Sequence, residues 1–405
     1  MERFTGLIGI VVLLSIAFAM SNNRKKLNWR LIVWGLLLQL LFAIFILKTP
    51  IGQPFFGAFD TLIKKLISFS DAGSDFLFSS YITGAVESPL INFAFRALPT
   101  IIFFSALMAI LYYLGIMQVI VKSIAWVMER TLKTSGAETL SVSANIFVGQ
   151  TEAPLLIRPF VKGLTQSEVM AIMVGGFATV AGGVMAIYVK ILTDIPGIAG
   201  HLMAASIMSA PAAMVIAKII YPETETPVTA DDDTIHVDKI DDNAMESLAR
   251  GATQGLKLAA NVAGMLVAFV AIIAMFNSIL GIAGLSLEGI LGLIFRPLAW
   301  TMGVPWNEAG ILGALMGEKI VLTELIAYAD LSKLHVGTDI SARTAIIASY
   351  ALCGFANFAS IGIQIGGLGG IAPERRKDFA KLGLKAMFGG ALASWLTATV
   401  AGILI

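Results

Sequence analysis

The stretch from Asn145 to Phe160 (NIFVGQTEAPLLIRPF) places one carboxylate, that of Glu152, between two apolar segments. An ionisable group at membrane depth is costly when it faces lipid, so such a group usually marks a functional site. Gly149 and Pro154 flank Glu152, and both residues disfavour an unbroken helix. We therefore expect a re-entrant hairpin whose tip presents polar groups. The alternative is a cytoplasmic loop in which Glu152 is solvated.

The composition of the chain is that of a membrane protein. Of the 405 residues, 57% are hydrophobic and only 14% are charged, whereas charged residues make up roughly a quarter of soluble domains. The net charge of +1 gives no indication of a nucleic-acid partner. The single cysteine, Cys353, excludes an intrachain disulfide. No zinc-protease or P-loop motif occurs, so nothing in the sequence indicates an enzyme or a cofactor.

The apolar runs predict an all-α polytopic membrane protein with about eight transmembrane helices, because a span needs roughly 20 mostly apolar residues. Two further apolar stretches, Val142–Ile157 and Ile311–Tyr328, are shorter, contain glycine and carry acids. We expect these two to be re-entrant helical hairpins. The expected spans are Thr5–Met20, Leu31–Leu47, Pro99–Ile120, Val169–Val189, Met203–Ile220, Ala259–Ile282, Thr344–Leu368 and Ala386–Ile405.

The placement of lysine and arginine predicts the orientation, because cytoplasmic loops carry an excess of both. All the main basic clusters fall on one side of the membrane if the two short stretches enter and return without crossing. Both termini then lie outside the cell. The clusters occupy residues 24–30, 122–133, 158–162, 250–257 and 375–385.

Three other segments are not expected to span. Phe55–Phe69 and Gln118–Leu132 mix apolar with charged residues, which is typical of interfacial helices. Tyr221–Glu246 is acidic and contains proline, which predicts a solvated, flexible cytoplasmic loop.

Two heptads indicate an internal repeat. Gly176–Gly182 reads GFATVAG and Gly354–Ser360 reads GFANFAS, and each follows one of the short acid-bearing stretches. In the predicted topology the two segments run in opposite directions, so the repeat is inverted. Secondary transporters are commonly built from inverted repeats with interrupted segments around a midplane site. Chance similarity between small-residue segments is the alternative, since such residues pack membrane helices generally.

The polar groups on the repeated elements favour a neutral ligand. They are amides, hydroxyls and two carboxylates, with Lys319 as the one nearby cation, whereas an anionic substrate would favour a set dominated by arginine or lysine. A carboxylate can accept from two sugar hydroxyls, and an amide can read the edge of a base. The polar groups are Asn145, Gln150, Thr151, Glu152, Thr179, Thr323, Glu324, Asn357 and Ser360.

Three ordered motifs carry a resemblance to a known family. Gly149–Leu155 (GQTEAPL) resembles the hairpin-tip motif of the concentrative nucleoside transporters. Gly317–Tyr328 (GEKIVLTELIAY) resembles their G-x-K-x-x-x-N-E-F-V-A-Y signature, and Cys353–Gly362 resembles a third. The resemblance covers nearly the whole chain. The second motif departs from the family pattern at Thr323, Leu325 and Ile326.

The resemblance implies a role for particular residues. It assigns the nucleobase to Gln150, Thr151 and Glu152 with Val184 as an apolar wall, and the ribose to Glu324, Asn357 and Ser360 with Phe355 nearby. It also assigns a sodium ion, bound mostly by backbone carbonyls, to Asn145, Val148, Thr179 and Val180.

The resemblance also implies a homotrimer in the cytoplasmic (inner) membrane of a bacterium, importing nucleosides such as uridine with sodium and no cofactor. A scaffold part and a moving part would divide the chain. Residues 1–134 form N-terminal spans and interfacial helices, 135–220 the first repeat, 221–250 the acidic loop, 251–298 a scaffold span with an interfacial helix, and 299–405 the second repeat.

Sodium rather than proton coupling is favoured by two side-chain oxygens, because hard cations bind oxygen ligands. Asn145 and Thr179 carry them where broken backbone could free carbonyls. The alternative roles are a helix-tip cap for Asn145 and a bond from Thr179 back to its own helix. A proton-coupled nucleoside symporter, or a symporter of the same architecture for another polar organic solute, therefore stays open.

The topology yields a testable prediction. In a chain whose native Cys353 has been replaced, a cysteine placed in the Arg375–Lys377 loop should be protected from an impermeant thiol reagent added outside. One placed near Leu334 should react. The opposite labelling pattern would mean that at least one short stretch crosses the membrane.

Overall fold

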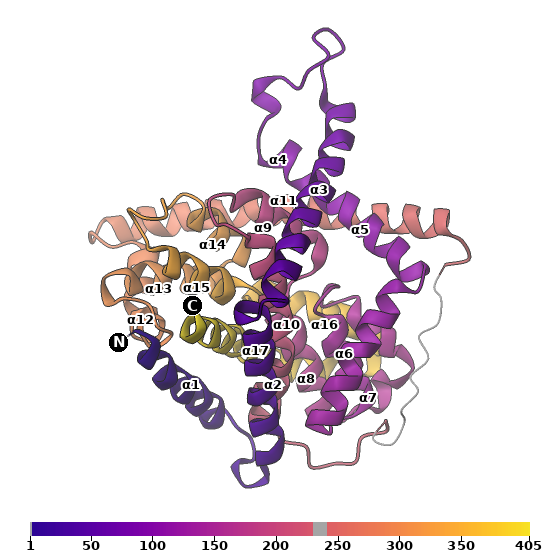
Figure 1. Ribbon diagram of the computed structural model, residues 1–405, viewed down its shortest axis with the longest axis vertical. Coiled ribbons are helices and arrows are strands. Elements are labelled where there is room, and N and C mark those ends of the chain that lie inside the picture. Colours follow the sequence, from indigo (N-terminus) through magenta and orange to yellow (C-terminus); the bar gives the residue numbers. More distant parts are fainter. Residues whose placement is uncertain (1, 230–240) are drawn as a thin grey trace.

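The computed structural model describes residues 2–229 and 241–405, so the predicted loop Tyr221–Glu246 lies partly outside the described residues. In the described part the secondary structure is helical (Figure 1). The α-helices are α1 (Glu2–Ala19), α2 (Trp29–Lys48), α3 (Gly52–Phe78), α4 (Phe93–Arg96), α5 (Leu98–Tyr113), α6 (Ile116–Leu132), α7 (Gly136–Ala144), α8 (Gln166–Ala178), α9 (Gly182–Ile191), α10 (Ile198–Ile220), α11 (Ala244–Gly281), α12 (Leu287–Thr301), α13 (Trp306–Val321), α14 (Glu324–Leu331), α15 (Ala342–Leu352), α16 (Phe358–Ile371) and α17 (Arg376–Leu404). Short 3-10 helices are η1 (Arg24–Lys26), η2 (Ser88–Leu90), η3 (Ala153–Gly163) and η4 (Pro373–Arg375).

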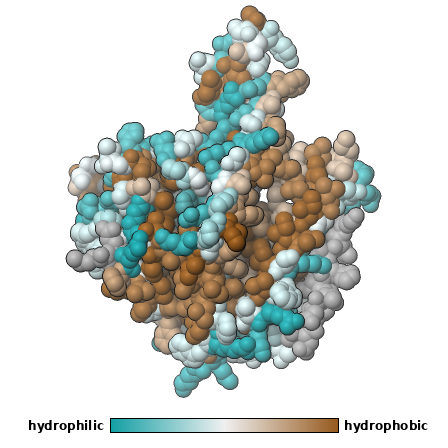
Figure 2. Space-filling view, viewed as in Figure 1, coloured by the Kyte–Doolittle hydropathy of each residue, from teal (hydrophilic) through white to brown (hydrophobic). Residues whose placement is uncertain are grey.

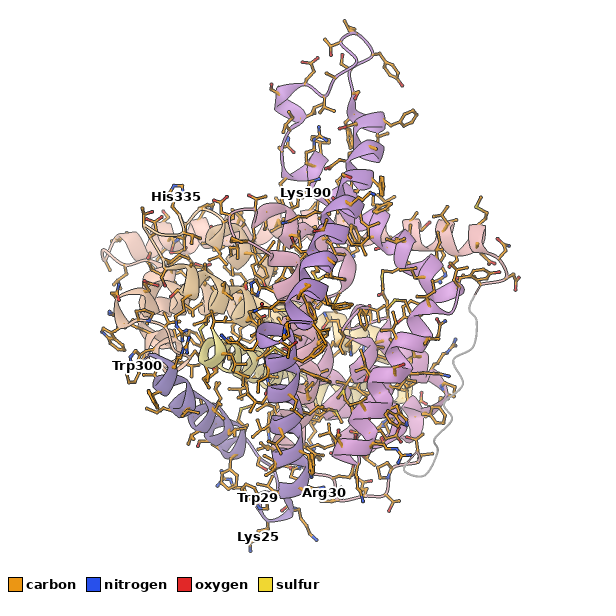
Figure 3. All side chains as sticks on the ribbon, viewed as in Figure 1. Lys25, Trp29, Arg30, Lys190, Trp300 and His335 are labelled. Atoms are coloured by element: carbon orange, nitrogen blue, oxygen red, sulfur yellow. The ribbon has the colours of Figure 1, made fainter. Side chains whose placement is uncertain are left out.

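The predicted membrane architecture is confirmed. Among the described residues, six helical segments are long and apolar enough to cross a membrane: α2, α4 with α5, α8 with α9, α10, α11 and α17. The two remaining expected spans are α1 and the α15–α16 pair, in which α1 and α16 are shorter apolar helices. A broad apolar surface crosses the middle of the molecule (Figure 2). Lys25 and Arg30 lie at the end opposite Lys190 and His335 (Figure 3).

Both short acid-bearing stretches are interrupted helices. In the first hairpin, α7 ends at Ala144, an irregular turn follows, and η3 returns against α7. In the second, α13 ends at Val321 and α14 begins at Glu324, so two residues separate the helices. The Thr323 side chain accepts a hydrogen bond from the backbone N–H of Ile326. The breaks therefore fall at the polar residues, as the sequence predicted.

Each hairpin is followed by a broken helix pair and then by a long helix. The order is α7–η3, α8–α9 and α10 in the first repeat, and α13–α14, α15–α16 and α17 in the second. The two breaks pack against each other at Gly354, whose φ of +110° favours glycine. A Cβ atom there would lie 2.6 Å from the carbonyl oxygen of Phe177. This contact joins the two repeats at their centres.

Some expected boundaries are wrong, for local reasons. Pro99–Ile120 is not one span, because Gly115 adopts φ +82° and separates α5 from α6. Thr344–Leu368 is two helices separated at Cys353–Asn357. The segment Phe55–Phe69 belongs to the longer α3, whose far end projects with α4 beyond the other helices (Figure 1).

Candidate functional site

The tip of the first hairpin bends the Glu152 carboxylate back onto its own backbone. Glu152 Oε2 accepts a hydrogen bond from the Gly149 N–H at 3.0 Å. A Cβ atom on Gly149 would lie 3.4 Å from the same oxygen, so the small residue permits this close turn. The remainder of the Glu152 side chain is exposed. A carboxylate that its own backbone holds in place is available to a ligand.

A cavity of about 120 Å³ lies between the first hairpin and helices α5, α6 and α11, and Glu152 is part of its lining. Tyr112 also lines it, and its hydroxyl has no hydrogen-bond partner among the described residues. At another part of the lining, Arg250 donates to both oxygens of Asp241, at 2.7 and 2.6 Å. These hydrogen bonds lower the pKa of the Asp241 carboxyl. The cavity is therefore lined by two carboxylates: Asp241 is paired with Arg250, and Glu152 forms no ion pair with the described residues.

Gln150 points away from this cavity lining and toward α16. Its Oε1 accepts a hydrogen bond from Gln364 Nε2 at 2.9 Å. Thr151, the next residue, packs against Gly367, where an added Cβ would lie 2.8 Å from the threonine Cγ2. The hairpin tip is thus seated on the helix that begins at the second break.

Glu324 is buried, with 5% of its surface exposed, and both of its oxygens have partners. Oε1 accepts from the Tyr188 hydroxyl at 2.8 Å, and Oε2 accepts from Asn357 Nδ2 at 2.8 Å. Asn357 Oδ1 in turn accepts from the backbone N–H of Ser360, which caps α16. Glu324 is the first residue of α14, where the partial positive charge of the helix stabilises a carboxylate.

Lys319, the cation expected near these groups, forms its hydrogen bonds elsewhere. Its Nζ donates to the carbonyls of Ala351 and Cys353 at 2.9 and 3.1 Å, and to Ser394 Oγ at 2.9 Å. These contacts fix the broken end of α15. Lys319 therefore stabilises the second break by donating hydrogen bonds to backbone carbonyls of that break.

The four residues expected at a sodium ion come from two adjoining segments. Asn145 and Val148 lie at the first hairpin, and Thr179 and Val180 lie at the first helix break; all four are buried. The segments are joined by a hydrogen bond of 2.9 Å from the N–H of Gly182 to the carbonyl of Phe147.

The side chains of this set differ in how well they suit a cation. Asn145 is 1% exposed, and neither polar atom of its side chain has a partner among the described residues. Thr179 Oγ1 donates to the Gly175 carbonyl at 2.9 Å, which is the back-bonded alternative. An oxygen lone pair of that hydroxyl is still available. Oxygen-only donors of this kind suit a hard cation.

The two acids predicted at the substrate lie in two different places. Glu152 lines the cavity beside hairpin one, while Glu324, Asn357 and Ser360 form a buried cluster at the second break. Helix α16 connects them, because Asn357 caps its N-terminus and its Gln364 contacts the first hairpin. Val184 is buried on α9, and Phe355 is half-buried within the second break.

Sequence reasoning missed Tyr188 and Gln364. Tyr188 lies in an apolar run, where a tyrosine gives no signal of a hydrogen bond to an acid. Gln364 was detectable in principle, as a lone amide inside the apolar, glycine-rich stretch Phe358–Ile371. Polar side chains within membrane helices usually bond to a neighbouring helix.

Three family models match the chain. The Na+ dependent nucleoside transporter C-terminus matches residues 201–402, its N-terminus matches residues 8–81, and a nucleoside recognition (gate) model matches residues 94–194.

Relatives match along the whole chain. An uncharacterized transporter of Haemophilus influenzae is 44% identical, with 100% of this chain and 98% of the relative covered. Uncharacterized transporter YutK of Bacillus subtilis is also 44% identical, with both chains fully covered. Sodium/nucleoside cotransporter 1 of Mus musculus is 41% identical over all of this chain, which spans 64% of the mouse protein.

Solved structures of CNTnw share the fold. The inward-facing substrate-bound state has a TM-score of 0.90 at 41% identity, covering 100% of this chain and 98% of that one. A variant of the same protein in an outward-facing state has a TM-score of 0.92, with the same identity and coverage. The chain described here therefore belongs to the family of Na+-dependent nucleoside transporters.

Proposed function

We propose that this chain imports nucleosides in symport with sodium, by alternating access of a moving transport part. One observation carries the proposal: in a member of a sodium-dependent nucleoside transporter family, two acid-bearing hairpins meet two broken helices that pack on each other. Such discontinuous segments at matching positions of two repeats are where transporters bind substrate and coupling ion. The chain is a transporter and not an enzyme, and sodium is the co-transported ion.

The nucleobase is assigned to the tip of the first hairpin. Glu152 supplies an acceptor beside a cavity, and Gln150 and Thr151 supply an amide and a hydroxyl on the same turn. Val184 adds an apolar wall from α9. This combination suits a flat, neutral heterocycle with both hydrogen-bond donors and acceptors.

The ribose is assigned to the cluster at the second break. Each oxygen of Glu324 accepts one hydrogen bond from the protein, and each has a further lone pair for a sugar hydroxyl. Ser360 and Asn357 lie beside it at the start of α16, and Phe355 is in the same break. Two vicinal hydroxyls would satisfy the remaining acceptor capacity.

Sodium is assigned to Asn145, Val148, Thr179 and Val180. The unpartnered amide of Asn145 supports this assignment, because a buried polar group without a partner is otherwise costly. The site would join the first hairpin to the first break. The Thr179 hydroxyl donates to its own helix, so it would bind the ion through its remaining oxygen lone pair.

The moving part is assigned to residues 135–220 and 299–405, and the scaffold to residues 1–134 and 251–298. The cavity beside Glu152 supports this division, because α5 and α11 line it from one side and the first hairpin from the other. We further propose a homotrimer in a bacterial cytoplasmic membrane, with both termini outside. Helix α11 exposes apolar side chains along its length, as contact with lipid or another subunit requires.

We expect uridine to compete for uptake far more strongly than uracil. Uracil lacks the ribose hydroxyls that would donate to the remaining lone pairs of the buried Glu324 carboxylate, and losing such hydrogen bonds to a charged group costs about 1–3 kcal/mol, which is roughly 5–150-fold in affinity. The measurement is inhibition of labelled uridine uptake in proteoliposomes. Equal competition by the two compounds would remove the ribose assignment.

Tyr188→Phe should weaken nucleoside binding about fivefold or more, because the Glu324 carboxylate loses the donor that orients it. The matched control is Tyr328→Phe. Its hydroxyl donates to the Ser349 carbonyl at 2.7 Å, and its ring packs on Tyr188. The control should lower thermal stability and leave affinity unchanged. Wild-type affinity in Tyr188→Phe, measured by calorimetry, contradicts the prediction.

Sodium should raise nucleoside affinity, and nucleoside should raise sodium affinity by the same factor, because the two sites share the first hairpin. Typical couplings are about 1–3 kcal/mol. Asn145→Ala or Thr179→Val should weaken this dependence. The measurement is nucleoside affinity of purified protein in sodium and in choline at fixed pH. A wild type whose affinity ignores sodium and follows pH would establish the proton symporter instead.

A further inference from the structure

Gln364 is a buried amide that contacts the hairpin tip from the opposite repeat. It lies one helical turn after Ser360 on α16, with 1% of its surface exposed. Its Nε2 donates two hydrogen bonds, one to Gln150 Oε1 at 2.9 Å and one to the backbone carbonyl of Met173 at 3.0 Å. Both bonds cross between the two repeats, because Gln150 and Met173 belong to the first repeat and Gln364 to the second.

The Met173 carbonyl fixes the direction of both amides. A backbone carbonyl only accepts hydrogen bonds, so the Gln364 atom that faces it must be the nitrogen. That nitrogen only donates, so the Gln150 atom that faces it must be the oxygen. Turning Gln364 over would place its oxygen against the carbonyl of Met173. Gln150 is therefore left with its Nε2, a donor, as the group available to a ligand.

The surrounding packing holds the two amides together. Gly176 lies directly beneath them, and a Cβ atom there would lie 2.6 Å from Gln364 Nε2 and 2.9 Å from Gln150 Cβ. Any larger residue at this position would push the amides apart. The contact of Thr151 with Gly367 adds a second point at which the hairpin tip rests on α16.

We propose that Gln364 is a positioning residue that sets which atom of Gln150 reads the nucleobase. The inference rests on the proposed function, in which Gln150 contacts the base. With Nε2 as its available group, Gln150 donates to a hydrogen-bond acceptor of the base, such as a ring carbonyl. Asn357 caps α16, and Ser360 and Gln364 both lie on it. The hydrogen bond from Gln364 to Gln150 therefore fixes the position of the base-binding residue relative to the ribose-binding residues.

The test compares uridine with 2-thiouridine and 4-thiouridine, in which one carbonyl acceptor is replaced by the weaker acceptor sulfur. Affinities are measured by calorimetry on the purified protein in sodium. The wild type should prefer uridine about three- to tenfold over one thio analogue, as expected for one hydrogen bond. Gln364→Met frees the Gln150 amide to rotate, so this preference should fall below about twofold. A wild type that prefers uridine over neither analogue overturns the proposal.

Two further variants separate positioning from general damage. Gln39→Met is the matched control, because Gln39 is also a fully buried amide, donating to Thr397 Oγ1 at 3.0 Å away from the hairpin tip. It should lower thermal stability and leave the preference for uridine unchanged. Gly176→Ala should reproduce the effect of Gln364→Met by steric separation of the amides, and it keeps the test decisive if Gln364→Met does not fold.

Gln150→Met distinguishes failure of this inference from failure of the base assignment. If Gln150→Met abolishes the preference while Gln364→Met and Gly176→Ala retain it, Gln150 reads the base without help and the positioning role is wrong. If Gln150→Met itself retains the preference, the assignment of the base to Gln150 is wrong. When Gln150→Met and Gln364→Met are combined, the preference for uridine should be no lower than in either single variant, because both substitutions remove the same interaction.

Discussion

Backbone groups at membrane depth must find hydrogen-bond partners inside the protein, and this requirement is greatest where the two hairpins and the two broken helix pairs are interrupted. The carbonyls at the broken end of α15 are bound by the ammonium group of Lys319. Since that side chain comes from α13, the second hairpin and the second break cannot be positioned separately. Lys319, which the sequence placed near Glu324 as a cation, serves as a hydrogen-bond donor to the backbone of the second break.

The two breaks are tied to each other as well as to their hairpins. Gly354 sits against the end of α8, and the N–H of Gly182 bonds to the first hairpin. These contacts join the two repeats at their centres. If the proposed moving part shifts as one body, the surfaces that must change are its contacts with α5 and α11, which line the cavity beside Glu152.

The sequence predicts the architecture well because its strongest signals are local. Apolar runs of sufficient length locate the spans, and acids within short apolar stretches locate the hairpins. Two expected spans were wrong because a glycine with positive φ interrupts each of them: Gly115 lies between α5 and α6, and Gly354 lies between α15 and α16. Hydropathy does not reveal the backbone conformation of a glycine. The partner residues were missed for a different reason. Tyr188 and Gln364 matter through contacts that join distant segments, and a single sequence carries no record of which segments meet.

Helix α11 has a consequence for how the protein sits in a lipid bilayer. Its 38 residues make it about 57 Å long, nearly twice the roughly 30 Å of the hydrocarbon core. A helix of that length must tilt steeply or extend beyond the membrane. Because α11 packs along α5 and exposes the rest of its apolar surface, any tilt of α11 is shared with α5. The thickness of the host membrane therefore affects how α5 and α11 are oriented, and these two helices line the cavity opposite the first hairpin.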